Sequence, residues 1–308
     1  MLRKVQKSES TPESKLKVPL NTIIEHAQSL SSDLELAVRA ASAAGQVIIE
    51  GANELSRGES GKIERKGIGD LVSEVDRDAD RAAIDVLQSG SSLPILSEEL
   101  NCDVETEDSM WILDPLDASS AFLMQAGTEY PSVLVAQRQQ NETALGVAYF
   151  PLIDAWYYAI RGTGAWKNSK RLVCDMAEPL EQVWVEMNQY GDASLETKYF
   201  RSLNERLRSD QGACLVTSNV PHAGVAMRIA DGNSSLAAAV HDNNPASVKQ
   251  GPWDIAAPQV ILEEAGGVFL NPEGERSDPF TCEPVIVARS RSLADVIVEL
   301  GKSQRVSG

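Results

Sequence analysis

The feature that most constrains the fold is a succession of short apolar segments in the middle of the chain. Each segment has the length of a strand and is separated from the next by turn residues. The segments cover residues 111–113, 132–137, 145–148 and 154–160. This succession predicts a sheet of mostly antiparallel strands that follow one another along the chain.

Helical patterns lie on both sides of this predicted sheet. Apolar residues recur at helical spacing over 34–52 and 76–87. The second of these helices would direct its charged residues outward, namely Arg77, Asp78, Asp80 and Arg81. In the second half, strands at 183–186 and 268–270 accompany helix candidates at 202–208, 223–230 and 258–264. Helices layered on mixed sheets, an α+β arrangement, fit this order better than alternating parallel α/β units.

The charge of the chain excludes some classes of partner. The 308 residues include 28 basic and 45 acidic ones, which gives a formal net charge of −17. Such a charge argues against a nucleic acid or an anionic membrane as a partner. No apolar run approaches the roughly 20 residues that span a bilayer, so we expect a soluble protein.

Cysteine and histidine residues give no sign of a zinc site or a disulfide framework. The four cysteines, Cys102, Cys174, Cys214 and Cys282, are scattered and contain no C-x-x-C pair. We therefore expect the cysteines to be free thiols in a reducing cytoplasm. The three histidines are also unclustered, which makes a histidine-based metal site or a phosphohistidine mechanism a poor hypothesis.

Acidic residues occur at positions where surface acids are not expected. Asp114 and Asp117 flank a proline directly after an apolar strand, and Glu98 follows the apolar run 93–96. Asp254 lies in an otherwise apolar helix start. Two carboxylates three residues apart on a tight turn cannot both stay ionised without a cation between them. Oxygen ligands with no Cys or His among them suit magnesium, manganese or calcium.

Each of these acids also has a plainer interpretation. Asp254, taken alone, is more often an N-cap than a ligand. A Glu-Glu pair such as Glu98-Glu99 is usually solvated, and Asp-Pro-x-Asp is usually a simple turn. The metal hypothesis therefore depends on the four signals occurring together and in order.

That order resembles the signature of the inositol monophosphatase-like family, over roughly residues 34–290. The motifs that carry the resemblance are Asp70-Leu71-Val72-Ser73-Glu74-Val75-Asp76, Ser97-Glu98-Glu99, Trp111-Ile112-Leu113-Asp114-Pro115-Leu116-Asp117, Gly146-Val147-Ala148-Tyr149-Phe150-Pro151, Gly162-Thr163-Gly164-Ala165-Trp166, Trp253-Asp254-Ile255-Ala256-Ala257 and Glu264-Ala265-Gly266-Gly267. The resemblance implies a layered α-β-α-β-α sandwich of the sugar-phosphatase (fructose-1,6-bisphosphatase-like) type. Within it we expect a disordered lead at 1–30, an N-terminal subdomain at 31–180 with most metal ligands, and a C-terminal subdomain at 181–308.

The resemblance also implies roles for individual residues. Glu98, Asp114 and the main-chain carbonyl of Leu116 would bind one magnesium ion, and Asp114, Asp117 and Asp254 a second, with two or three ions in all. The catalytic residues would be Asp76 and Ser119, which would orient the metal-activated water that attacks the phosphate.

The match is imperfect where the substrate phosphate should bind. The family usually has Asp-Gly-Thr at this point, and this chain has Asp117-Ala118-Ser119-Ser120. Backbone amides of Ala118, Ser119 and Ser120 would face the phosphate if the turn avoids a positive φ at Ala118, because alanine disfavours that conformation. In the family a polar pair of residues follows this motif. In this chain the apolar pair Ala121-Phe122 takes its place, which removes a candidate substrate contact.

The resemblance leaves the substrate open. A magnesium-dependent phosphomonoesterase acting on inositol monophosphate is the first hypothesis. The long 118–130 segment looks more like a 3'(2'),5'-bisphosphate nucleotidase acting on 3'-phosphoadenosine 5'-phosphate, and His222 or Arg228 would then contact a second phosphate or a base. A catalytically weak binding relative is the third. We also expect a cytoplasmic homodimer that binds a small phosphorylated metabolite and neither nucleic acid nor membrane.

Overall fold

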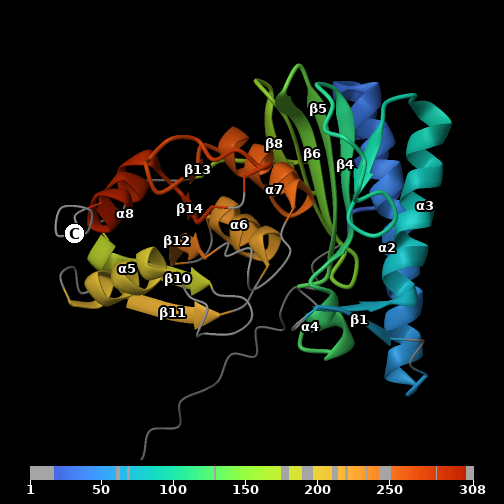
Figure 1. Ribbon diagram of the computed structural model, residues 1–308. Helices are drawn as coiled ribbons and strands as arrows, with labels where there is room; N and C mark the ends of the chain where they lie inside the picture. The colour runs from blue at the N-terminus through green and yellow to red at the C-terminus, as the bar shows by residue number, and fades with distance from the viewer. Residues whose placement is uncertain are drawn as a thin grey trace, which may run out of the picture.

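The computed structural model describes residues 17–59, 63–67, 70–127, 130–174, 180–188, 197–209, 214–218, 221–232, 235–242, 251–281 and 283–302. Within these residues a seven-stranded and a five-stranded β-sheet alternate with three layers of helices (Figure 1). Strands β1 (Ile63–Gly67) and β2 (Asp70–Ser73) form a separate two-stranded antiparallel sheet. Three hydrophobic clusters fill the spaces between the layers. The predicted α-β-α-β-α sandwich is therefore confirmed.

The first layer consists of three helices, α1 (Leu20–Leu30), α2 (Ser32–Ser56) and α3 (Glu74–Gly90). Helix α2 begins where the Ser31 hydroxyl accepts a hydrogen bond from the backbone N–H of Asp33 at 3.1 Å, which satisfies one free donor of the first turn. The expectation of disorder up to residue 30 is wrong for α1, because Ile23 and Ala27, four residues apart, are both buried there. Residues 1–16 lie outside the described part.

The second layer is a seven-stranded sheet with the order β3-β4-β5-β6-β7-β8-β9. Its strands are β3 (Ile95–Ser97), β4 (Met110–Asp117), β5 (Ser132–Gln139), β6 (Glu142–Phe150), β7 (Ala155–Ile160), β8 (Gly164–Lys167) and β9 (Lys170–Leu172). Every neighbouring pair from β4 onward is antiparallel, and only β3 runs parallel to its neighbour. This is the predicted succession of adjacent strands.

Two helices form the middle layer, α6 (His222–Asp231) and α7 (Pro252–Glu264), and they lie between the two sheets (Figure 1). Helix α7 begins six residues before the predicted start at Pro258. Pro258 lies inside the helix, whereas Pro252 occupies the first turn, where its missing N–H has no cost. This earlier start places Asp254 in the first turn of α7.

The second sheet is mixed and has the order β11-β10-β12-β14-β13. Its strands are β10 (Trp184–Asn188), β11 (Cys214–Ser218), β12 (Leu236–His241), β13 (Val268–Leu270) and β14 (Val285–Ala288). Helices α5 (Lys198–Ser209) and α8 (Arg291–Lys302) cover its outer face. The first sheet ends before residue 180 and the second begins after it, while α7 packs against both. The subdomain boundary near 180 stays a prediction.

One charged residue of α3 is buried rather than exposed. Asp80 has no solvent-accessible surface, and its Oδ2 accepts hydrogen bonds from the Ser97 hydroxyl at 2.9 Å and the Leu100 N–H at 2.8 Å. The prediction of an outward Asp80 is therefore wrong. Its carboxylate is buried because it satisfies the polar groups at the end of β3, which helical periodicity alone does not reveal.

Candidate active site

Three aspartates from two layers converge at one end of β4. One carboxylate oxygen from each of Asp114, Asp117 and Asp254 lies within 4.8 Å of the other two. Strand β4 reaches this point through a change of register between Asp114 and Asp117, at Pro115, which has no N–H for the ladder. We refer to Asp114, Asp117 and Asp254 as the carboxylate cluster.

Asp254 combines two roles that the sequence presented as alternatives. Its Oδ2 accepts a hydrogen bond from the Gly251 N–H at 2.8 Å, so it serves the first turn of α7 in the manner of a capping residue. It is also a member of the carboxylate cluster. The local capping pattern therefore did not exclude a place in the site.

The cluster holds more negative charge than a buried site tolerates on its own. Burial is the largest cause that raises the pKa of Asp114 well above its ordinary value, followed by the charges of Glu98, Asp117 and Asp254. Burial and then the charge of Asp254 raise the pKa of Asp117 in the same way. A bound cation would reverse this effect, because it favours the ionised form of every carboxylate that faces it.

One oxygen of Asp114 is left without a partner. Its Oδ1 accepts a hydrogen bond from the Leu116 N–H at 3.1 Å, whereas its buried Oδ2 has none. Buried acceptors normally have a hydrogen-bond partner, so an orphaned carboxylate oxygen in a group of acids is what a cation site requires. Asp117 accepts hydrogen bonds from the Ser132 hydroxyl, to its Oδ2 at 3.1 Å, and from the backbone of Ala118. The residues present therefore fit a hard divalent cation.

Glu98 and Leu116, two further predicted ligands, lie beside this cluster. Glu98 follows β3, and its N–H donates to the carbonyl of Leu113 at 3.2 Å, which ties it to β4. Its charge raises the pKa of Asp114, so the two carboxylates are close. The carbonyl of Leu116 accepts a hydrogen bond from the Ser119 hydroxyl at 2.9 Å and has a second lone pair available.

The predicted catalytic pair, Asp76 and Ser119, is in direct contact. The Ser119 Oγ is 2.5 Å from Oδ1 of Asp76, although the two residues are 43 positions apart. The other carboxylate oxygen of Asp76 accepts from both the N–H and the hydroxyl of Ser73, at 2.8 and 2.6 Å. Asp76 therefore cannot turn away from Ser119 without breaking the start of α3.

The loop expected to bind phosphate differs from the prediction at Ala118. This residue has φ 71° and ψ 37°, in the left-handed region where alanine is disfavoured. The condition that the sequence set for the amides to face a phosphate, a turn without positive φ at Ala118, is therefore not met. The chain has to turn there between β4 and the short helix α4 (Ser119–Leu123), and glycine would do so without strain. Phe122 is buried against the helices of the first layer, which explains an apolar residue at this position.

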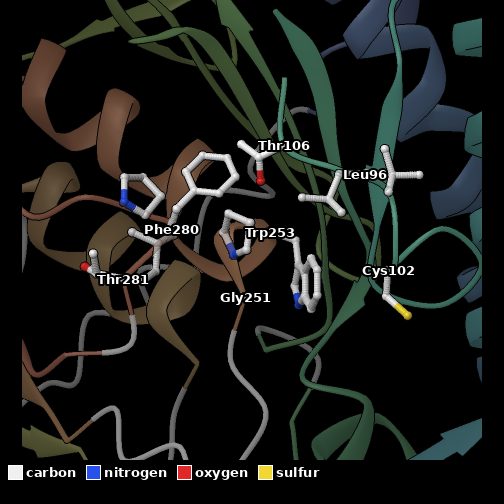
Figure 2. Close-up of a pocket in the computed structure, with 11 residues that line it drawn as sticks. Leu96, Cys102, Thr106, Gly251, Trp253, Phe280 and Thr281 are labelled. Carbon is white, nitrogen blue, oxygen red and sulfur yellow. The ribbon is translucent and has the colours of Figure 1, made fainter. Parts of the chain in front are cut away.

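An apolar pocket of about 230 Å³ lies next to two of the segments that carry the acids. Figure 2 shows Leu96 and Phe280 on either side of it and Trp253 beneath. Leu96 precedes Glu98 by two residues, and Trp253 directly precedes Asp254. Among the described residues, no acid lines the pocket, so the pocket is not the metal site itself.

Three supporting residues, Ser73, Asp80 and Ser132, were not predicted from the sequence. Ser73 stands directly before the acidic residues of its motif, where its capping position was a usable signal. Ser132 is only the first residue of a predicted strand, and its contact with Asp117 depends on the pairing of β4 with β5. No local pattern identifies such a contact.

The fold and this site define a class, a layered α/β sandwich with a buried carboxylate cluster at the end of a strand. The model of the "Inositol monophosphatase family" matches residues 29–304, and the chain belongs to this family. It is accordingly a phosphomonoesterase. No helix among the described residues is long and apolar enough to cross a membrane.

Individual relatives carry several names. A "Fructose-1,6-bisphosphatase/inositol-1-monophosphatase" of Aquifex aeolicus is 29% identical over 285 residues, which cover 89% of this chain and 97% of the relative. A "Nus factor SuhB" of Haemophilus influenzae is 30% identical, with 77% and 84% covered. A solved inositol monophosphatase of Thermotoga maritima superposes with a TM-score of 0.70 at 23% identity, covering 88% of this chain and 97% of that one, and supports the fold.

Proposed function

We propose that this chain is a magnesium-dependent phosphomonoesterase that hydrolyses a small phosphorylated metabolite, with inositol monophosphate as the first candidate. The observation that carries the proposal is the buried carboxylate cluster with its unpartnered Asp114 oxygen. An all-oxygen set of donors favours Mg²⁺ over zinc. A protein with a net charge of −17 would repel a phosphate ester, and bound cations would reverse the sign locally.

The proposed ligands form two groups. Glu98, Asp114 and the carbonyl of Leu116 would hold one ion, and Asp114, Asp117 and Asp254 another, with two or three ions in all. Bound Mg²⁺ would neutralise charge on the phosphoryl oxygens and acidify water in the site. Such a contribution from metal ions is needed, because an enzyme that hydrolyses phosphomonoesters must stabilise the transition state by an amount on the order of 20 kcal/mol or more.

Asp76 and Ser119 are proposed to orient the attacking water. The Ser119 hydroxyl has one proton, which Asp76 or the Leu116 carbonyl accepts, and its oxygen has lone pairs left for a hydrogen bond from water. Asp76 is held in place by Ser73 and can draw the proton of that water through Ser119. Backbone amides of Ala118, Ser119 and Ser120 are proposed to bind the substrate phosphate from the left-handed turn that Ala118 makes, in place of the turn without positive φ that the sequence suggested, and no covalent phosphoenzyme is needed.

A bisphosphate is the second candidate substrate. The name of the Aquifex relative covers both a bisphosphate and a monophosphate. The 118–130 segment also resembles that of the 3'(2'),5'-bisphosphate nucleotidases, which act on 3'-phosphoadenosine 5'-phosphate. A cytoplasmic homodimer, as the resemblance implies, belongs to the same proposal, and light scattering of the purified chain tests the dimer.

Phosphate release with and without Mg²⁺ tests the proposal. Inositol 1-phosphate and 3'-phosphoadenosine 5'-phosphate are compared in parallel, and the ratio of their kcat/KM values identifies the preferred class. Magnesium-dependent release from either supports the proposed chemistry. Absence of release from a panel of phosphate esters that includes both, with Mg²⁺ bound, would overturn it in favour of a catalytically weak binding protein.

A further inference from the structure

Helix α3 carries two buried aspartates one turn apart, Asp76 and Asp80. Residues four positions apart lie on the same face of a helix, one above the other. Asp76 contacts Ser119, its partner in the proposed catalytic pair. Asp80 belongs neither to that pair nor to the carboxylate cluster. Any effect of Asp80 on the site therefore passes through the residues that it contacts.

The contacts of Asp80 are concentrated in the turn that follows β3. Its Oδ2 accepts hydrogen bonds from the Ser97 hydroxyl at 2.9 Å and from the Leu100 N–H at 2.8 Å. A backbone hydrogen bond from Glu99 also reaches this carboxylate. The Ser97 hydroxyl in turn accepts from the Asn101 N–H at 3.1 Å, which extends the network by one residue. Asp80 thus holds both ends of the turn.

Glu98, a proposed metal ligand, lies inside this turn. Its own N–H donates to the carbonyl of Leu113 at 3.2 Å, next to the end of β3. Beyond that bond the backbone leaves the sheet, and residues 98–100 belong to neither a helix nor a strand. Because the neighbours of Glu98 on both sides are bonded to Asp80, the direction of the Glu98 side chain depends on that carboxylate.

Water cannot replace the Asp80 carboxylate in this network, because Asp80 and Ser97 are both fully buried. A buried donor that loses its acceptor costs more free energy than the hydrogen bond itself contributes, so the turn would have to move to find a new partner. Helix α3 cannot adjust instead, because Ala79 and Ala83 are fully buried in the first layer, where α3 packs against α2 and β4.

We propose that Asp80 is a positioning residue for Glu98, and that α3 thereby fixes the Glu98 side of the metal site relative to Asp76 and Ser119. One face of one helix would then hold both the catalytic pair and a metal ligand in place. This inference rests on the proposed function, in which Glu98 binds Mg²⁺. Removal of a residue that orients a metal ligand typically weakens metal binding by about 10- to 100-fold.

Calorimetry of Mg²⁺ binding to Asp80→Ala tests the inference. This variant should bind Mg²⁺ about 10- to 100-fold more weakly than the wild-type protein, at a temperature where circular dichroism shows both to be folded. Asp80→Asn keeps an oxygen that can accept from Ser97 and Leu100, so it should restore most of the affinity. The inference is overturned if Asp80→Ala keeps the wild-type affinity, or if Asp80→Asn binds as weakly as Asp80→Ala.

A double-mutant cycle shows whether Asp80 acts through Glu98. Glu98→Gln should itself weaken Mg²⁺ binding, and adding Asp80→Ala should then cause little further loss, because both changes affect one ligand. Fully additive losses would contradict the inference. Ser97→Ala removes a single bond of the network and serves if Asp80→Ala does not fold. It should weaken Mg²⁺ binding by about 3- to 10-fold, the range for one lost hydrogen bond, and an unchanged affinity would count against the inference.

Asn271→Ala is the matched control for loss of stability. Asn271 Oδ1 likewise accepts from two backbone N–H groups, those of Glu273 at 3.1 Å and Glu275 at 2.9 Å, in the turn after β13 of the second sheet. This variant should be less stable than the wild-type protein and keep its affinity for Mg²⁺. A loss of affinity as large as that of Asp80→Ala would show that the effect is general destabilisation and would overturn the inference.

Failure of the proposed function gives a different result. In that case the wild-type protein binds Mg²⁺ but releases no phosphate from any ester, and the Mg²⁺ affinities of the variants still decide the role of Asp80. A wild-type protein that binds no Mg²⁺ would overturn both proposals.

Discussion

At the scale of single residues, the ionisation of the carboxylate cluster has a consequence for stability. Burial and mutual repulsion raise the pKa of Asp114 and Asp117, and burial raises that of Asp80 to about 6. An acid with a raised pKa in the folded state binds protons more readily there than in the unfolded chain. Its ionisation therefore destabilises the folded protein above the raised pKa, and lowering the pH through that value removes the penalty.

The metal-free protein should therefore become more stable as the pH falls through about 6, the raised pKa of Asp80, toward the ordinary value of 3.8. His241 opposes this trend at lower pH, because burial holds its pKa well below the ordinary value of 6.5 and its protonation would favour unfolding. Thermal unfolding with a chelator measures the effect, and Asp114→Asn isolates the cluster. On acidification the thermal midpoint of the variant should rise less than that of the wild-type protein. An equal rise in both midpoints would argue against the raised pKa of Asp114.

Ala118 offers a second test at this scale. Because its φ of 71° is disfavoured for alanine, Ala118→Gly should raise the free energy of unfolding by about 1 kcal/mol, after the greater freedom of glycine in the unfolded chain is subtracted. Chemical denaturation checks it. A loss of stability would mean that Ala118 does not adopt this conformation.

The limits of sequence-based prediction are clearest for single residues. Asp114, Asp117 and Asp254 were predicted together because each belongs to a short motif and the order of these motifs along the chain resembles that of a family. Asp80 was misplaced because helical periodicity does not reveal a polar partner from another layer, here Ser97. Ala118 adopts a left-handed conformation that alanine disfavours. The fold imposes it, because the chain must turn there between β4 and α4, and the residue type alone does not predict it.

At the scale of elements, the start of α7 depends on close packing next to the acids. A Cβ added to Gly251 would lie 2.4 Å from Cε2 of Trp253, closer than any real contact. Some strands and helices were predicted near their observed bounds, as for β5 and α6, whereas β4 continues four residues beyond the predicted segment 111–113, to Asp117. The helix candidate at 258–264 began six residues too late, although the residues around Asp254 already had the pattern of a helix start, and α7 continues through Pro258.

Gly251→Ala should therefore displace Trp253 and with it Asp254. We expect a loss of about 1–3 kcal/mol in the free energy of unfolding and weaker binding of Mg²⁺. Gly90→Ala is the matched control, because its Cβ would meet only the end of the flexible Leu36 side chain. Calorimetry of Mg²⁺ binding gives the readout. Unchanged affinity in Gly251→Ala would show that Asp254 does not need this packing.

At the scale of the whole molecule, the site is assembled from two layers. Asp114 and Asp117 belong to the first sheet, and Asp254 belongs to the helix layer between the sheets. A cation held by all three would connect these layers in the folded state only. Binding to the folded state alone stabilises it by mass action.

Magnesium should accordingly raise the thermal midpoint of the protein. At a free concentration 100 times the dissociation constant, the stabilisation is about 2.7 kcal/mol for one site. Asp114→Asn should lose most of this effect, whereas Asp85→Asn, on the exposed side of α3, should keep it. An equal shift in all three proteins would indicate that Mg²⁺ acts elsewhere.

The most direct test of the proposed function is the rate of phosphate release by Asp114→Asn at saturating Mg²⁺, beside the wild-type protein and Asp85→Asn. Asp114 is predicted to contact both proposed metal positions, so its variant should keep the fold, checked by circular dichroism, and lose at least about a thousandfold in kcat, or about 4 kcal/mol. Near-normal turnover by a folded Asp114→Asn protein would contradict the assignment of the carboxylate cluster as the catalytic metal site.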